Sequence, residues 1–138
     1  MKILAVQIKS SEAILVVLKK NDDGLIFQTN ESTKFQLADH SNSNQVKQFR
    51  DQINAAFDTI EPDRIIILAR NANGKGRLAP SPVSFKLEGI MQLYTKKNIE
   101  FMWPQTISAY LKKEPIALKA ENKYQQDALH AAYIIIKE

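Results

Sequence analysis

Apolar and polar residues alternate in blocks along the first third of the chain, and these blocks predict strands. Residues Ile3–Ile8 and Ala13–Leu18 are nearly continuous apolar runs, which are typical of strands covered on both faces. A turn signal at 21–24 separates the second run from a third run at Leu25–Thr29. The third strand either ends there or resumes near Phe35, and the pattern does not decide between the two. The blocks predict an antiparallel meander of three strands.

Helical periodicity begins after the polar residues 41–44. Apolar side chains recur at spacings of three and four from Val46 to Ile60, which predicts an amphipathic helix ending before Pro62. The dipeptide Ser81-Pro82 then predicts the start of another helix, with serine as its cap and proline at its first position. The other predicted elements are the strands Arg64–Ala69 and Ile99–Met102, a short helix at Pro104–Leu111 and a last helix within Asn122–Ile136.

This order predicts an α/β protein with a mixed sheet. Helices appear only after the third strand, and the later strands alternate with them. Such an order joins an antiparallel meander to parallel βαβ units. A length of 138 residues fits one domain with a sizeable core, so we expect a single domain over residues 1–138 with five strands.

The last predicted helix carries an acid beside its apolar stripe. Apolar residues recur every four positions from Tyr124 to Ile136, and Asn122 with Gln125 has the spacing of a capping box. Asp127 then falls in the second turn. An acid at this place is solvated, paired with a cation, or used in chemistry.

Composition narrows the possibilities only modestly. The chain has no cysteine, which excludes disulfides, thiolate metal sites and cysteine nucleophiles. A net charge of +4 weakly favours anionic partners. Gln7 and Lys9 interrupt the apolar start, and no apolar run approaches the ~20 residues that span a bilayer. We therefore expect a cytoplasmic protein with no membrane partner.

The last helix also carries the most specific resemblance to known proteins. The segment 127–132, Asp-Ala-Leu-His-Ala-Ala, resembles the pattern that closes RuvC-like domains of the ribonuclease H-like fold. The phrases at 84–89, 104–107 and 122–128 are similar to a small bacterial family known only as domain of unknown function 3010. The resemblance covers essentially the whole chain and implies a ribonuclease H-like sheet with helices on both faces.

The resemblance also implies where a catalytic centre would lie. Nucleases of this fold use two divalent ions ~4 Å apart, held by several carboxylates. The resemblance places these acids on the first strand, after the fourth strand and as a pair on the last helix. The matching positions here are Gln7, Ala69 or Arg70, Tyr124 and Asp127. One carboxylate and one amide do not offset two dications, so we do not expect cleavage by two ions.

Asp127 remains the catalytic candidate, with two alternatives. If a single Mg²⁺ or Mn²⁺ binds, the candidate ligands are Asp127, Gln7 and Glu12, since divalent ions of this kind take oxygen ligands. Otherwise the acid is structural, stabilised by the helix dipole for ~0.3–1 kcal/mol or paired with Arg70.

The loop after the fourth strand is the candidate nucleic-acid interface. Arg70, Lys75 and Arg77 lie there, beside glycines that allow a backbone to approach, at the end of the sheet where ligands usually bind. A surface loop with solvated charges is the alternative.

Three other side chains receive structural interpretations. Glu88 is expected to be solvated, His130 to lie on the helix surface, and Trp103 to pack at a turn from strand to helix.

The leading hypothesis is a RuvC-like domain that has lost its catalytic acids and binds nucleic acid or a protein, including a second copy of itself. The competing hypothesis is a divergent metal-dependent nuclease or phosphodiesterase that uses Asp127. A third is a structural partner protein with no ligand in its cleft.

Overall fold

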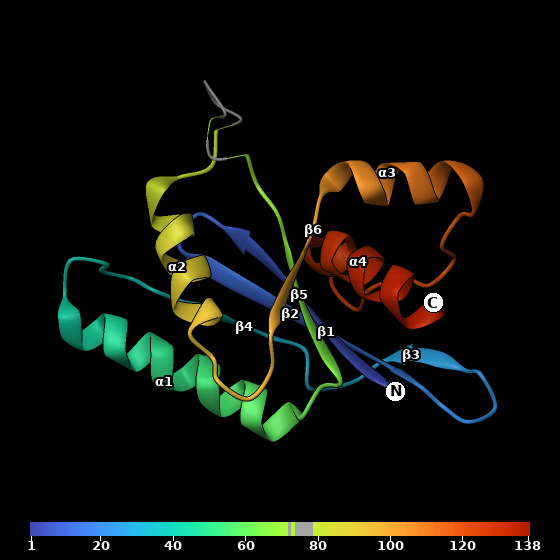
Figure 1. The fold of residues 1–138 in the computed structure, drawn as a ribbon, viewed down its shortest axis with the longest axis horizontal. Coiled ribbons are helices and arrows are strands. Elements are labelled where there is room, and N and C mark those ends of the chain that lie inside the picture. Colours follow the sequence, from blue (N-terminus) through green and yellow to red (C-terminus); the bar gives the residue numbers. More distant parts are fainter. Residues whose placement is uncertain (72, 74–78) are drawn as a thin grey trace.

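The computed structural model describes residues 1–71, 73 and 79–138, and these form a mixed sheet between two layers of helices (Figure 1). The described residues contribute six strands, in the order β3-β2-β1-β5-β6 with β4 also beside β2. The strands are β1 (Lys2–Lys9), β2 (Glu12–Lys20), β3 (Ile26–Gln28), β4 (Thr33–Gln36), β5 (Arg64–Leu68) and β6 (Ile99–Met102).

The sheet has an antiparallel half and a parallel half, as the sequence predicts. β1 pairs antiparallel with β2, whereas β5 runs parallel to both β1 and β6. The predicted third strand is divided, because β3 and β4 pair with opposite ends of β2. Between them the Ser32 hydroxyl accepts the Val17 backbone N–H at 3.0 Å. This side chain replaces one ladder bond while the chain turns, so the sheet has six strands where five were expected.

The helices start where local capping chemistry predicts. The Asn42 side chain accepts the backbone N–H groups of Asn44 and Gln45, and Ser81 caps the helix that begins with proline. The helices are α1 (Ser43–Ile60), α2 (Pro82–Gln92), α3 (Pro104–Lys113), the 3₁₀ turn η2 (Lys123–Gln125) and α4 (Gln126–Lys137).

The start of the last helix differs from the prediction in one respect. The capping box between Asn122 and Gln125 is present, but it closes the 3₁₀ turn η2. The α-helix proper begins only at Gln126, so Asp127 lies in the first turn of α4 and not in the second. A carboxylate in the first turn interacts favourably with the helix dipole.

Two cores lie on opposite faces of the sheet. Helices α1 and α2 cover one face and α4 the other, with α3 outside α4 (Figure 1). Strand residues alternate between the two cores, so Leu4 and Val6 point to α1 while Ile3 and Ala5 point to α4. By this alternation Gln7 belongs to the α4 face. Three fully buried alanines let α4 approach the sheet closely, Ala128, Ala131 and Ala132.

Within residues 1–71, 73 and 79–138, none of the helices combines the length and the hydropathy that crossing a bilayer requires.

Candidate functional site

The carboxyl ends of the three parallel strands meet at one edge of the sheet, and a cavity opens there. Gln7 comes from β1, Arg70 follows β5, and Asp127 and His130 project from α4. This cavity has a volume of about 440 Å³, and its remaining lining residues are Ile8, Leu68, Ala69, Pro104, Ile107, Ser108 and Leu111. The fold therefore brings together residues that are far apart in the sequence.

Gln7 and Asp127 contact each other directly. The Gln7 Nε2 atom donates a hydrogen bond to Asp127 Oδ2 at 3.3 Å. The other amide atom, Gln7 Oε1, is buried and has no hydrogen-bond partner within the described part of the chain. The Asp127 carboxylate is therefore satisfied in part by a neutral donor, and an acceptor oxygen stays open beside it.

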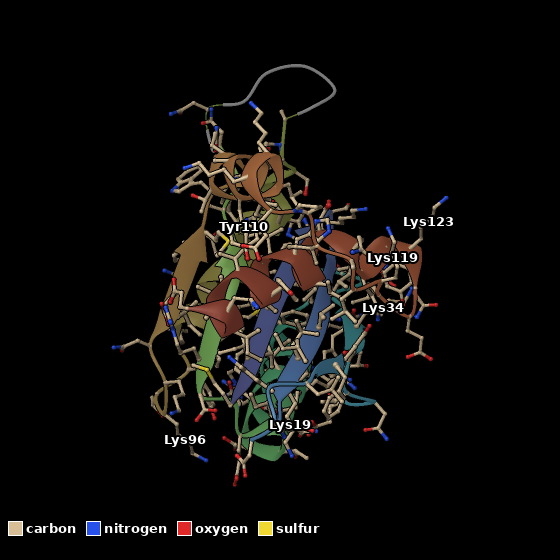
Figure 2. The ribbon with its side chains drawn as sticks, turned by 90° about the vertical axis from the view of Figure 1, so that its right-hand side faces the viewer. Lys19, Lys34, Lys96, Tyr110, Lys119 and Lys123 are labelled. Atoms are coloured by element: carbon tan, nitrogen blue, oxygen red, sulfur yellow. The ribbon has the colours of Figure 1, made fainter. Side chains whose placement is uncertain are left out.

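The position where the resemblance places a second acid on the last helix is occupied by an aromatic ring. Tyr124 is 39% exposed, and the Lys34 Nζ atom lies 4.9 Å from its ring centroid. Lys34 also pairs with Glu12 at 3.7 Å. Figure 2 shows Lys34 on the same flank of the molecule as Lys119 and Lys123. A cation from the protein thus lies over the side chain at the position where the resemblance places the second helix acid.

Arg70 is paired, but its partner is Glu88. The guanidinium Nη2 lies 3.2 Å from Glu88 Oε1 and donates to the Ser84 carbonyl at 3.3 Å. Its carbon atom lies 4.6 Å from the Phe85 ring centroid. Burial lowers the pKa of Arg70, while the charge and hydrogen bond of Glu88 raise it. The Arg70–Asp127 pair that the sequence left open is therefore not formed.

The prediction that Glu88 is solvated is wrong, because Glu88 pairs with Arg70. The side chains of Arg70 and Glu88 are only 14% and 19% exposed. Both charges are largely removed from water, and each is compensated by the other. The physical reason lies in tertiary structure, because α2 packs beside the end of β5 and turns Glu88 towards Arg70.

His130 is held by a neighbouring amide. The Gln126 Oε1 atom accepts the Ala120 backbone N–H at 2.8 Å, and this fixes the orientation of the amide. Its Nε2 atom donates to the Leu118 carbonyl and lies 3.1 Å from His130 Nε2. Because an amide nitrogen only donates, His130 Nε2 accepts, and the imidazole carries its proton on Nδ1.

The environment of His130 also favours the neutral imidazole. Burial lowers the pKa of His130, and the charge of Lys119 lowers it further, while Asp127 acts in the opposite direction. The residue is half-buried and lines the cavity. His130 thus stays partly exposed on α4 at the wall of the cavity, while the segment before η2 folds back over this side of the helix.

Two further cavities lie along α3, and we call the three together the α3 groove. One, of about 530 Å³, shares Ile8, Ala69, Arg70 and Pro104 with the first, and its other lining residues are Lys9, Ser10, Asn71, Ala79, Pro80, Ser81, Trp103 and Gln105. The other, of about 580 Å³, is lined by Pro104, Gln105, Ser108, Ala109, Lys112 and Lys113.

The charged side chains of the α3 groove are mostly cations. Among the described lining residues Asp127 is the anion, and the cations are Lys9, Arg70, Lys112 and Lys113, of which Arg70 is already paired with Glu88. The N-terminal ends of α2 and α3 also open onto the groove, and their dipoles contribute further positive potential. The groove therefore favours an anionic ligand.

Trp103 lies at the rim of this groove. Trp103 does stand at the turn from strand to helix, but it is 51% exposed, so the expectation that it packs there is wrong. Pro104 begins α3 immediately after it, and both residues line the 530 Å³ cavity.

The donor set does not fit a two-ion centre. The described residues contain no cluster of three or more histidine, aspartate or glutamate side chains that could hold a metal ion. Glu12 stands beside Lys34, outside the described lining of the cavity that contains Gln7 and Asp127. One carboxylate cannot offset the mutual repulsion of two dications.

The site thus brings together some of the residues predicted from the sequence. Gln7, Arg70 and Asp127 line one cavity. Lys75 and Arg77 lie outside the described residues. Sequence reasoning missed Lys9 and the lysine pair of α3. The position of α3 in the sequence could have indicated these residues. A helix that starts directly after a parallel strand lies at the edge of the sheet where ligands usually bind.

Comparison with solved structures shows the same fold. A structure of Thermus thermophilus RuvC matches with a TM-score of 0.73 at 10% sequence identity, covering 99% of this chain and 97% of that chain. T. thermophilus RuvC in complex with a Holliday junction substrate matches at 0.68 and 10% identity, covering 96% and 90%. The yeast mitochondrial Holliday junction resolvase matches at 0.55 and 10% identity, covering 80% and 56%.

These matches confirm the predicted RuvC-like, ribonuclease H-like fold. The search of curated proteins by sequence found no match. A family model does match, over residues 1–135 and therefore over nearly the whole length. The chain belongs to the family described as "Protein of unknown function (DUF3010)".

Proposed function

We propose that this chain is a RuvC-like domain that binds the sugar-phosphate backbone of nucleic acid in the α3 groove and does not cleave it by the two-ion route. The observation that carries the proposal is the groove itself. It lies at the carboxyl ends of parallel strands, where open α/β sheets usually bind ligands. Its described lining has three lysines against the carboxylate of Asp127, while the charge of Arg70 is compensated by Glu88.

The Gln7–Asp127 hydrogen bond supports the loss of cleavage. Where a nuclease of this fold would gather carboxylates, this chain has an amide, a carboxylate and the ring of Tyr124 beneath Lys34. An amide donor stabilises Asp127 without a metal ion. Binding does not need the lost acids, because phosphate contacts depend on cations and N–H donors.

The comparisons support nucleic acid as the ligand class. One matching structure holds a Holliday junction, and another is described as a Holliday junction resolvase. At 10% identity these structures share a fold with this chain, so the ligand class is our inference. The cationic groove is the independent support.

The test is direct. We expect fluorescence anisotropy to show binding of labelled junction, duplex and single-stranded DNA and RNA, with affinity falling steeply as salt rises from about 50 to 200 mM. We expect no cleavage of these substrates with Mg²⁺ or Mn²⁺. If no nucleic acid binds at the lowest salt, the proposal is wrong, and a protein partner, including a second copy of this chain, becomes the hypothesis to test.

A second candidate function rests on the buried, unpartnered Gln7 Oε1 atom beside Asp127. A carbonyl and a carboxylate oxygen are acceptable ligands for one hard cation. A divergent metal-dependent phosphodiesterase could use such a site. Cleavage of a branched or hybrid substrate with Mn²⁺, lost in Asp127→Asn, would establish this function. Calorimetry that detects no Mn²⁺ or Mg²⁺ binding would exclude it.

A further inference from the structure

Trp103 is a solvent-exposed aromatic residue in the lining of the α3 groove. It occupies the N-cap position of α3, with Pro104 after it, and its carbonyl accepts the Thr106 backbone N–H at 3.0 Å. The backbone is therefore held between a strand and a helix. Trp103 is nevertheless 51% exposed, so about half of its surface stays in contact with solvent. An exposed large aromatic residue that lines a concave cavity with polar groups beside it is a candidate for ligand contact.

The surroundings of Trp103 indicate which ligand would cover it. The same cavity is lined by Lys9, Asn71 and Ser81, and no acidic side chain is found among the described residues that line it. Its volume of about 530 Å³ lies in the range of small-molecule sites. An aromatic face next to a cation and hydrogen-bonding groups suits a ligand with a flat ring and a phosphate.

We propose that Trp103 is a stacking platform for an unpaired nucleobase, while Lys9 contacts the phosphate backbone of the same strand. This inference rests on the proposed function and specifies its ligand. Every base presents a π face to an aromatic side chain, so stacking does not depend on sequence. Bases inside a duplex have both faces covered by their neighbours. The ligand is therefore a single strand, or a branched nucleic acid with an unpaired base.

The chain offers a specific probe, because Trp103 is its one tryptophan. The full chain is titrated with oligo-dT and oligo-U of about 15 nucleotides, and with a duplex of the same length. Tryptophan emission reports stacking, and the anisotropy of a labelled oligonucleotide reports binding. We expect the single strands to quench the emission and the duplex to leave it nearly unchanged.

Variants then separate stacking from general binding. Trp103→Ala should weaken single-strand binding about 5- to 150-fold, the equivalent of ~1–3 kcal/mol per stacked base, and should change duplex binding little. Trp103→Phe should keep most of the affinity. The matched control is Leu93→Ala, which removes an apolar side chain that is 72% exposed and lies outside the described lining of the groove. Circular dichroism verifies that each variant is folded.

The outcomes distinguish this inference from the proposed function. If single strands bind but leave the emission unchanged, and Trp103→Ala binds them equally well, the stacking role is wrong while nucleic-acid binding stands. If nothing binds, both are wrong. Phe101 is also exposed, at 40%, two positions before Trp103. If Phe101→Ala and Trp103→Ala both change the sedimentation of the protein alone, the two side chains form a protein interface, and the stacking inference is overturned.

Discussion

The Gln7 amide donates to the Asp127 carboxylate over 3.3 Å and joins the first strand to the last helix, 120 positions later in the chain. A RuvC-like nuclease would be expected to carry acids at both positions and a metal ion between them. In this chain a neutral donor meets the carboxylate. The contact therefore needs no cation, and it gives α4 a polar link to β1 at the edge of the α4-side core.

Gln7→Asp should change the response of the protein to divalent cations. The new carboxylate faces Asp127, so we expect a loss of about 1 kcal/mol in the free energy of unfolding at neutral pH through like-charge repulsion. Mn²⁺ should restore the lost free energy of unfolding, since two carboxylates bind a hard cation better than one. Urea denaturation with and without Mn²⁺ measures both effects. Gln7→Asn, which leaves the charge unchanged, should show no Mn²⁺ response; an equal response in the two variants would contradict this explanation.

Removing one charge of the Arg70–Glu88 pair should be costly. Glu88→Gln leaves the guanidinium 14% exposed without its counter-charge, and we expect a loss of about 2–3 kcal/mol, below the ~3–5 kcal/mol of fully buried pairs. The double variant Arg70→Met with Glu88→Leu should recover most of the loss. A double-mutant cycle by urea denaturation measures the coupling. Lys96→Met, which breaks the exposed pair with Asp58, should have a much smaller effect. Additive losses in the cycle would mean that the two charges do not stabilise each other.

The secondary structure was largely predictable because its signals are local. Ser81 caps α2 because its side chain meets a backbone N–H three residues later, and the capping box from Asn122 to Gln125 is equally local. Apolar periodicity over four turns defines α1 in the same way. The exception is the third strand, whose division depends on how β3 and β4 each pair with β2.

The site was predictable only in part, because its contacts are not local. Arg70 and Glu88 lie 18 positions apart, and only the packing of α2 brings them together. The exposure of Trp103 likewise depends on whether other parts of the fold pack over it, and a local sequence pattern does not contain that information. The resemblance to RuvC-like proteins did single out Gln7 and Asp127 as positions of one site, and the two side chains are in contact in the fold.

Stability should depend on the protonation of His130 below pH 6.5. Burial holds the pKa of His130 below its ordinary value of 6.5, so the folded state favours the neutral imidazole. The unfolded chain therefore binds the proton first as pH falls. The free energy of unfolding is therefore highest, as far as His130 is concerned, above pH 6.5. It decreases as pH falls from 6.5 towards the lower pKa of the folded state. Protonation also removes the acceptor that Gln126 uses.

Thermal unfolding between pH 7.5 and pH 5.5 measures this dependence. We expect the melting temperature to fall over this interval in the natural chain and to fall less in His130→Gln, which has no group that titrates there. His40→Gln removes the other histidine, an exposed residue, and serves as the control. An equal slope in the natural chain and in His130→Gln would show that the imidazole is not the group responsible.

The salt dependence of nucleic-acid binding should identify the cations of the interface. Lys112→Ala with Lys113→Ala removes two charges from the α3 groove, and we expect the slope of log K against log salt to become shallower by about 2, one unit for each lost phosphate contact. Lys19→Ala with Lys20→Ala removes the same charge from the end of β2, and Figure 2 shows Lys19 far from α3. This control should leave the slope nearly unchanged. Lys75→Ala with Arg77→Ala tests the loop predicted from the sequence in the same assay. Equal slopes for the α3 and β2 pairs would mean that net charge, and not the groove, attracts the ligand.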